Sequence, residues 1–127
     1  MKILKSLISW VEIPVIDMQR AVSFYEKILD VKLQTMPLGN LSMAFFPVEE
    51  SGIGGALCKH GGHYTPSENG VVIYLRAEPN IVAMLEKVEK AGGNIISNKK
   101  QISENPDYSF MALIKDTEGN RIALYEK

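Results

Sequence analysis

The segment that decides the fold is residues 10–29, Trp-Val-Glu-Ile-Pro-Val-Ile-Asp-Met-Gln-Arg-Ala-Val-Ser-Phe-Tyr-Glu-Lys-Ile-Leu. Its first part belongs to a stretch of alternating side chains, which predicts a strand over residues 7–15. Its second part carries apolar residues at helical spacing up to Leu29. Asp17 stands between the two parts and is suited to cap the helix, so the segment predicts a strand followed by a helix.

The same pattern returns sixty residues later. Residues 26–28 (Glu-Lys-Ile) recur at 86–88 as Glu-Lys-Val, and Val22 recurs as Val82. Similarity at one fixed offset indicates two copies of one structural unit. Each predicted helix also follows an apolar strand and precedes further strands, so the chain is expected to repeat one strand–helix–strands module.

The remaining elements follow from alternation and from turn residues. Seven further strands are predicted at about 31–36, 41–46, 54–58, 71–76, 94–97 (or prolonged to 102 with a bulge), 109–114 and 121–125. The second helix begins near residues 79–80 and stops at 92–93, turns are predicted at 37–40 and 116–120, and residues 59–70 form a linker. The prediction is an α+β fold with two βαβββ modules, about 1–60 and 70–127, in one domain spanning 1–127.

Composition limits the classes of function. The net charge of −1 gives no electrostatic reason to expect a nucleic acid or an anionic membrane as partner. No apolar run approaches the roughly 18 residues that span a bilayer, and the first residues lack the apolar core of a signal peptide. Cys58 is the single cysteine, so no internal disulfide can form. We therefore expect a cytoplasmic protein.

Three segments resemble the vicinal-oxygen-chelate superfamily, which includes glyoxalase I, bleomycin-resistance proteins and extradiol dioxygenases. They are residues 15–25 at the first helix, 91–93 after the second helix, and 116–122 near the end of the chain. The resemblance implies that the sheets of the two modules curl into a U-shaped cleft. It also implies a homodimer, because many members of the superfamily are homodimers.

In metal-using members, four inward-facing strand positions supply His, Glu or Gln ligands. The resemblance places these positions at Trp10, Ala56, Val72 and Ala123. None of these side chains offers the oxygen or nitrogen lone pair that a divalent ion needs. We therefore expect no metal and no other cofactor in the cleft.

Two histidines lie in the predicted linker. His60 and His63 are three residues apart, but no cysteine or carboxylate at a set spacing completes a metal site with them. Exposure to solvent is the simpler expectation for both. Cys58, on the cleft-facing side of its strand, is expected to be a buried and inert thiol, although a place among the ligand-binding residues stays open.

Glu12 is the candidate catalytic residue. It shares its side of the strand with Trp10, and a carboxylate beside an indole and apolar neighbours would suit a general base. The alternative is a partly solvated glutamate that pairs with a basic side chain such as Arg121, which the sequence also places among the ligand-binding candidates.

The aromatic residues Tyr74 and Tyr125 share the cleft-facing parity with Trp10, and Phe45 is a further candidate for this group. Such a wall could grip a planar or amphipathic ligand, because ligand pockets are mostly apolar with few polar anchors. The rings could equally fill the space that a metal and its waters would occupy.

The preferred interpretation is a metal-free protein of the glyoxalase and bleomycin-resistance type that binds a small organic molecule between its modules. The alternative is an enzyme of the same superfamily, a lyase, isomerase or dioxygenase that uses a metal or Glu12 as base. A purely structural dimer with a collapsed cleft is the third class.

Overall fold

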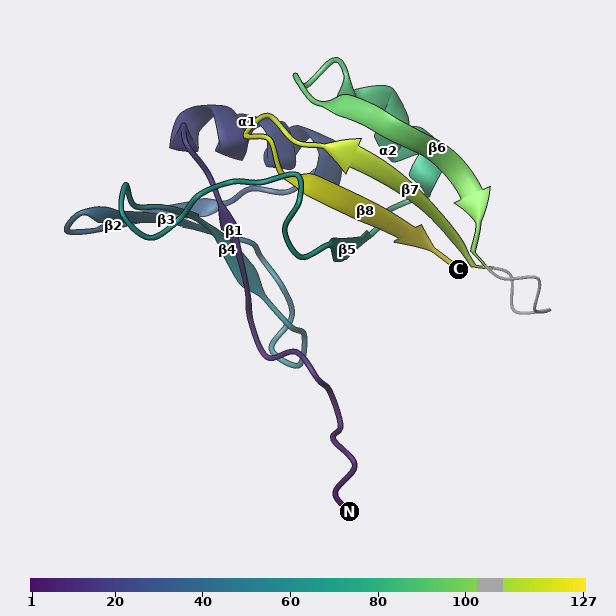
Figure 1. The fold of residues 1–127 in the computed structure, drawn as a ribbon, viewed down its shortest axis with the longest axis horizontal. Helices are drawn as coiled ribbons and strands as arrows, with labels where there is room; N and C mark the ends of the chain where they lie inside the picture. The colour runs from purple at the N-terminus through teal and green to yellow at the C-terminus, as the bar shows by residue number, and fades with distance from the viewer. Residues whose placement is uncertain (103–108) are drawn as a thin grey trace.

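The computed structural model describes residues 1–102 and 109–127, and these form two four-stranded sheets and two helices (Figure 1). The first module holds β1 (Val11–Pro14), α1 (Met18–Leu29), β2 (Gln34–Leu38), β3 (Leu41–Phe45) and β4 (Gly55–Lys59). The second holds β5 (Ile73–Arg76), α2 (Ile81–Val88), β6 (Asn94–Gln101), β7 (Phe110–Lys115) and β8 (Arg121–Glu126). The predicted α+β fold of two βαβββ modules is confirmed.

The two sheets have the same topology. The strand order is β1-β4-β3-β2 in the first sheet and β5-β8-β7-β6 in the second. In each sheet the first strand pairs in parallel with the last, and the other neighbours are antiparallel. The duplication seen in the sequence is therefore a duplication of strand connectivity.

The two helices bury equivalent positions. The buried residues of α1 are Ala21, Phe24, Tyr25 and Ile28, and those of α2 are Ile81, Met84, Leu85 and Val88, each sixty positions further on. Both helices begin at a side-chain cap: the carboxylate of Asp17 accepts from the amide of Arg20, and the side-chain oxygen of Asn80 accepts from the amide of Ala83.

One hydrophobic core joins the modules. It combines side chains from both helices with the inward faces of both sheets, and α1 contacts α2 directly. Gly93 marks the closest approach, because a Cβ at this position would lie 2.7 Å from the Phe24 ring and 2.8 Å from the carbonyl oxygen of Lys115. The pair of glycines after the second helix thus lets the modules pack.

Several boundaries differ from the prediction; β5, for example, begins at Ile73 and α2 ends at Val88. β1 covers four residues instead of nine because its partner β4 begins at Gly55, which is paired with Val11, so residues 7–10 have no described strand beside them. β2 is shifted and contains Pro37, which a sheet tolerates here because β2 is an edge strand. β6 extends to Gln101 through two shifts of register, as the longer alternative anticipated.

Among the described residues, neither helix has the length or the apolarity to cross a bilayer.

Candidate functional site

The four positions that would hold a metal in the superfamily carry no ligand atoms. Ala56 on β4 and Ala123 on β8 are fully buried, while Trp10 and Val72 lie just before β1 and β5. Within residues 1–102 and 109–127, no three His, Cys, Asp or Glu side chains are grouped so as to hold a metal ion. These side chains do not fit the metal site of the superfamily, and the metal-free state stays a prediction.

Glu12 lies on the face of the first sheet that points away from the main hydrophobic core, which we call the outer face. The parallel pairing of β1 with β4 places it beside Ala56. One carboxylate oxygen accepts a hydrogen bond from the Tyr64 hydroxyl (2.6 Å), and the other accepts from the indole N–H of Trp10 (3.3 Å). The linker therefore returns to the sheet and supplies a donor that the sequence did not reveal.

The floor around Glu12 is apolar. Met43, Ala56 and Cys58 form a small buried cluster that is separate from the main core, and Phe45 and Tyr64 pack against it. The Trp10 and Phe45 rings lie with their centroids 6.0 Å apart at an interplanar angle of 51°. Four of the predicted ligand-binding residues, Trp10, Glu12, Phe45 and Cys58, thus share one face of the first sheet. We name the five residues Trp10, Glu12, Phe45, Cys58 and Tyr64 the Glu12 face.

Two groups of the Glu12 face stay protonated at neutral pH. Burial, with the negative charge of Glu12, raises the pKa of the Cys58 thiol to about 11. The hydrogen bond to Glu12 raises the pKa of the Tyr64 hydroxyl to about 12. Because the thiolate is the reactive form of cysteine, Cys58 is not suited to act as a nucleophile. The Tyr64 hydroxyl is suited to donate a hydrogen bond and not to act as a base.

The second sheet carries the other predicted residues. Tyr74 is paired with Ala123 across the parallel strands, and its hydroxyl lies 3.5 Å from the sulfur of Met111. Tyr125 is paired with Met111 on the antiparallel side. Tyr74 is about half exposed, at 52%. The two tyrosines therefore lie on the face of the second sheet that points away from the core.

The alternative interpretation proposed that Glu12 pairs with Arg121. The structure does not contain this pair. Glu12 has Trp10 and Tyr64 as its partners, and Arg121 lies on β8 of the other sheet. The Nε atom of Arg121 is buried and has no hydrogen-bond partner among the described residues. It is thus a donor with unused capacity, which a ligand acceptor could fill.

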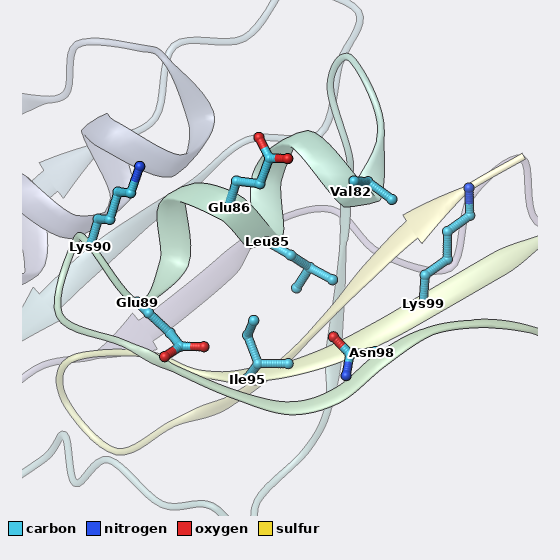
Figure 2. A pocket seen from close by; sticks show the side chains of 8 residues that line it. All are labelled: Val82, Leu85, Glu86, Glu89, Lys90, Ile95, Asn98 and Lys99. Carbon is cyan, nitrogen blue, oxygen red and sulfur yellow. The ribbon is translucent and has the colours of Figure 1, made fainter.

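No hydrogen bond or ring contact of the described residues joins the Glu12 face to Tyr74, Arg121 or Tyr125. Two hollows of the described surface lie elsewhere. One, of about 510 Å³, runs between α2 and β6 over Val82, Leu85 and Ile95 with a charged rim (Figure 2). Another, of about 370 Å³, is lined mainly by lysines of the two helices. The single chain therefore presents the two groups of predicted residues as separate surfaces.

The linker histidines lie against each other. The centroids of the His60 and His63 rings are 4.5 Å apart, and Nδ1 of His60 accepts from the amide of Gly62. No third ligand from the described residues joins them.

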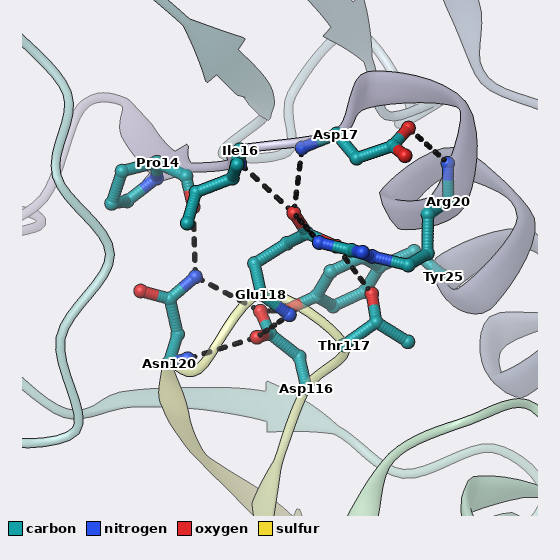
Figure 3. Close-up of polar contacts among 9 residues, drawn as sticks. All are labelled: Pro14, Ile16, Asp17, Arg20, Tyr25, Asp116, Thr117, Glu118 and Asn120. Carbon is teal, nitrogen blue, oxygen red and sulfur yellow. Dashed lines mark hydrogen bonds and ion pairs between the residues drawn. The ribbon is translucent and has the colours of Figure 1, made fainter. Parts of the chain in front are cut away.

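A polar cluster ties the two modules together, and the sequence did not predict it (Figure 3). Its members are buried except for Arg20, whose side chain is half exposed. We name Arg20, Tyr25, Asp116, Glu118 and Asn120 the clasp. One oxygen of Glu118 accepts from the amides of residues 16 and 17 at 2.9 and 2.8 Å, and the carboxylate also binds Arg20 through both oxygens, at 2.9 and 3.0 Å. Burial would raise the pKa of Glu118, but these hydrogen bonds lower it to about 2.

Asp116 forms the second half of the clasp. Its carboxylate accepts from the Tyr25 hydroxyl at 2.5 Å and from the side-chain amide of Asn120 at 3.0 Å. Asn120 also donates to the carbonyl oxygen of Pro14 at 2.8 Å. Burial and the neighbouring Asp116 charge raise the pKa of Tyr25 well above its ordinary value. The turn between β7 and β8 is thereby fixed to the start of α1.

The clasp lies within the sequence segments 15–25 and 116–122, which carry the resemblance to the superfamily. The one hint in the sequence is that the first segment holds a basic residue, Arg20, and the last an acidic residue, Glu118, and charge alone does not say that the two meet. The first and last of the segments that carry the resemblance therefore hold the two modules together.

Comparison with known proteins agrees with this architecture. The family model of the Glyoxalase/Bleomycin resistance protein/Dioxygenase superfamily matches residues 7–124. A search of curated proteins found no match.

Solved structures share the fold at low identity. UcmS2 is 23% identical with a TM-score of 0.70, and the alignment covers 98% of this chain and all of that one. A glyoxalase/bleomycin resistance protein from Albidiferax ferrireducens T118 is 17% identical with a TM-score of 0.70, covering 96% and 100%. Glyoxalase I from Zea mays is 20% identical with a TM-score of 0.65, covering 93% of this chain and 45% of that chain. The chain belongs to the Glyoxalase/Bleomycin resistance protein/Dioxygenase superfamily.

Proposed function

We propose that this protein binds a small organic molecule on the outer faces of its sheets, without a metal ion. The observation that carries the proposal is the arrangement of Glu12, whose carboxylate is held by Trp10 and Tyr64 above an apolar floor. An oriented polar group beside aromatic and aliphatic surface is the usual composition of a ligand pocket.

The geometry indicates a class of ligand. Each oxygen of Glu12 accepts one hydrogen bond from the protein, and a carboxylate oxygen has capacity for another. A ligand N–H or O–H group could therefore bind there, with a flat apolar part against Trp10 and Phe45. On the other sheet, the unpartnered Nε of Arg121 would favour an acceptor on the ligand.

The competing function is catalysis with Glu12 as general base, and the exposure of this carboxylate favours it. The binding function is better supported by the apolar floor under Glu12 and by the aromatic rings beside its carboxylate. The binding function therefore ranks first.

We also propose that the protein acts as a homodimer in the cytoplasm. The resemblance to a superfamily with many homodimers supports the dimer. The separation of the two groups of candidate residues supports it too, because a second copy could bring the faces together. The single, buried cysteine is compatible with a reducing compartment.

A thermal-shift screen of a broad compound library tests the binding function. A ligand at about 100 times its Kd adds roughly 2.7 kcal/mol to the free energy of unfolding. We expect at least one compound whose shift is lost in Glu12→Gln and kept in Glu89→Gln, a matched change on the rim of the α2–β6 hollow. If no compound shifts the melt, or if only Glu89→Gln abolishes the shift, the proposal is wrong.

A further inference from the structure

The first ten residues form an arm that leaves the body of the chain at β1 (Figure 1). All ten are exposed, although several are apolar: Ile3 is 91% exposed, Leu7 84%, Ile8 47% and Trp10 44%. The alternation that predicts a strand begins at residue 7, but paired β-structure begins only at Val11. Residues 7–10 of the arm thus have the sequence of a strand and no partner strand among the described residues.

The edge of β1 next to the arm is open for pairing. β1 is the outermost strand of its sheet. On its inner side, the amide of Val11 donates to the carbonyl oxygen of Gly54, just before β4, and the amide of Val15 donates to that of Cys58 on β4. Because successive backbone groups of a strand point to opposite sides, the N–H and C=O groups of even-numbered residues face the open edge. Pro14 has no N–H and closes this edge at its far end. The open edge therefore runs from Glu12 back into the arm.

We propose that the arms of two copies of this chain pair with each other as antiparallel strands, centred on Leu7. The inference rests on the homodimer proposed above and identifies its interface. Unpaired strand edges commonly recruit a further strand, and a two-fold interface brings the same segment of both copies together.

The register follows from the sequence. Centring on Leu7 places Ile8 opposite Ser6, Trp10 opposite Leu4 and Glu12 opposite Lys2 of the second copy. These even-numbered residues are the ones whose backbone groups face the open edge. Moving the centre to Ser6 sets Trp10 against Lys2, and moving it to Ile8 sets Glu12 against Leu4. Only the centre at Leu7 combines apolar pairs with an opposite-charge pair, which stabilises antiparallel strands.

The chemistry of this register favours a second copy over an unrelated partner, because the arm is complementary to itself. In the single chain, the Ser6 hydroxyl donates to the carbonyl oxygen of Ile8 at 3.1 Å, an acceptor that the ladder would use instead. Pairing would also bring the Lys2 ammonium and the Leu4 side chain of the partner subunit to the edge of the Glu12 face. Each copy would then contribute to the candidate site of the other.

Disulfide cross-linking of full-length chains tests the register. Leu7 and its copy form a non-hydrogen-bonded pair with Cα atoms about 4.5 Å apart, within reach of a disulfide. Ser9 and its copy are offset by four residues, about 13 Å along the strands, which is too far. Cys58 is buried, so it does not compete. On mild oxidation we expect a disulfide-linked dimer from Leu7→Cys and none from the matched variant Ser9→Cys.

A second measurement tests the arm interface independently of whether the protein forms a homodimer. Ile8→Pro removes an amide from the proposed ladder, whereas Ser9→Pro removes one that faces away from it. We expect sedimentation to show dimers for the unaltered chain and Ser9→Pro, and monomers for Ile8→Pro. If dimers persist in Ile8→Pro and Leu7→Cys does not cross-link, the arm interface is wrong while the homodimer stands. If the unaltered chain is monomeric at all concentrations, both are wrong, and capture of a different protein by the arm becomes the alternative.

Discussion

Two carboxylates of this molecule, Glu118 in the clasp and Glu12 on the Glu12 face, lie in contrasting environments. Glu118 is 5% exposed and is held by Arg20, two backbone amides and a threonine hydroxyl. Glu12 lies on an open sheet face and has two neutral donors, Trp10 and Tyr64. A carboxylate saturated by donors stabilises the fold, and one with spare capacity can bind a partner. The clasp therefore holds the two modules together, and the Glu12 face is the site that we propose for binding.

Removing the Glu118 carboxylate from the clasp should give the largest loss of stability. We expect Glu118→Ala to lower the free energy of unfolding by about 3 kcal/mol, because it leaves two backbone amides and the Thr117 hydroxyl without their acceptor and removes the partner of Arg20. Glu12→Ala should change it by no more than about 0.5 kcal/mol, as exposed substitutions usually do. Urea denaturation of both variants checks the difference. Equal losses would remove the distinction between the two regions.

Acid should weaken the clasp by a similar amount. The folded-state pKa of Glu118 is about 2, below its ordinary value of 4.5, so its stabilisation is fully present above pH 4.5 and is lost as the pH falls towards 2. The difference corresponds to about 3 kcal/mol between pH 5 and pH 2. Melting curves across this range measure it. In Glu118→Gln the same range should show a shallower decline, and an unchanged decline would assign the acid sensitivity to other groups.

The second half of the clasp should give an intermediate effect. Tyr25→Phe removes a buried hydrogen bond to the Asp116 carboxylate and should cost about 2 kcal/mol. Tyr74→Phe is a matched control, because its hydroxyl contacts only a methionine sulfur and its ring is half exposed. Chemical denaturation of both variants measures the two losses. A larger loss in Tyr74→Phe than in Tyr25→Phe would contradict the account.

Glu12→Gln should give the smallest change in stability together with a weaker affinity for the ligand. For a compound identified in the screen, we expect Glu12→Gln to raise Kd about tenfold, since a hydrogen bond to a charged acceptor contributes about 1.4 kcal/mol or more. The free energy of unfolding should stay nearly constant. The fluorescence of Trp10, the single tryptophan, reports the titration. An unaltered Kd would show that the compound binds outside the Glu12 face.

The sequence predicted the helices and strands, because each of them follows from a local pattern of apolar residues. The helices were found because apolar positions recur at helical spacing and again sixty residues later, and the buried positions of α1 and α2 match at that offset. The extent of β1 was overestimated because alternation indicates a strand, whereas pairing depends on where β4 begins.

The site was predicted only in part, for a related reason. The parity of Trp10 and Glu12 follows from a single strand, so these two could be placed together. Tyr64 reaches Glu12 across 52 residues, and Glu118 reaches the amide of Asp17 across 101. Such contacts depend on how the modules pack, and no local pattern encodes them. Residues 116–120 therefore looked like an ordinary turn.

The metal-binding positions of the superfamily correspond here to an indole, a valine and two buried alanines, and we propose that the protein binds its ligand without a metal. Elemental analysis of the purified protein tests it most directly. We predict far less than one equivalent of zinc, nickel, iron or manganese per chain, both before and after incubation with each ion and removal of the excess. One bound equivalent that is lost in Glu12→Gln or His60→Ala would contradict the account.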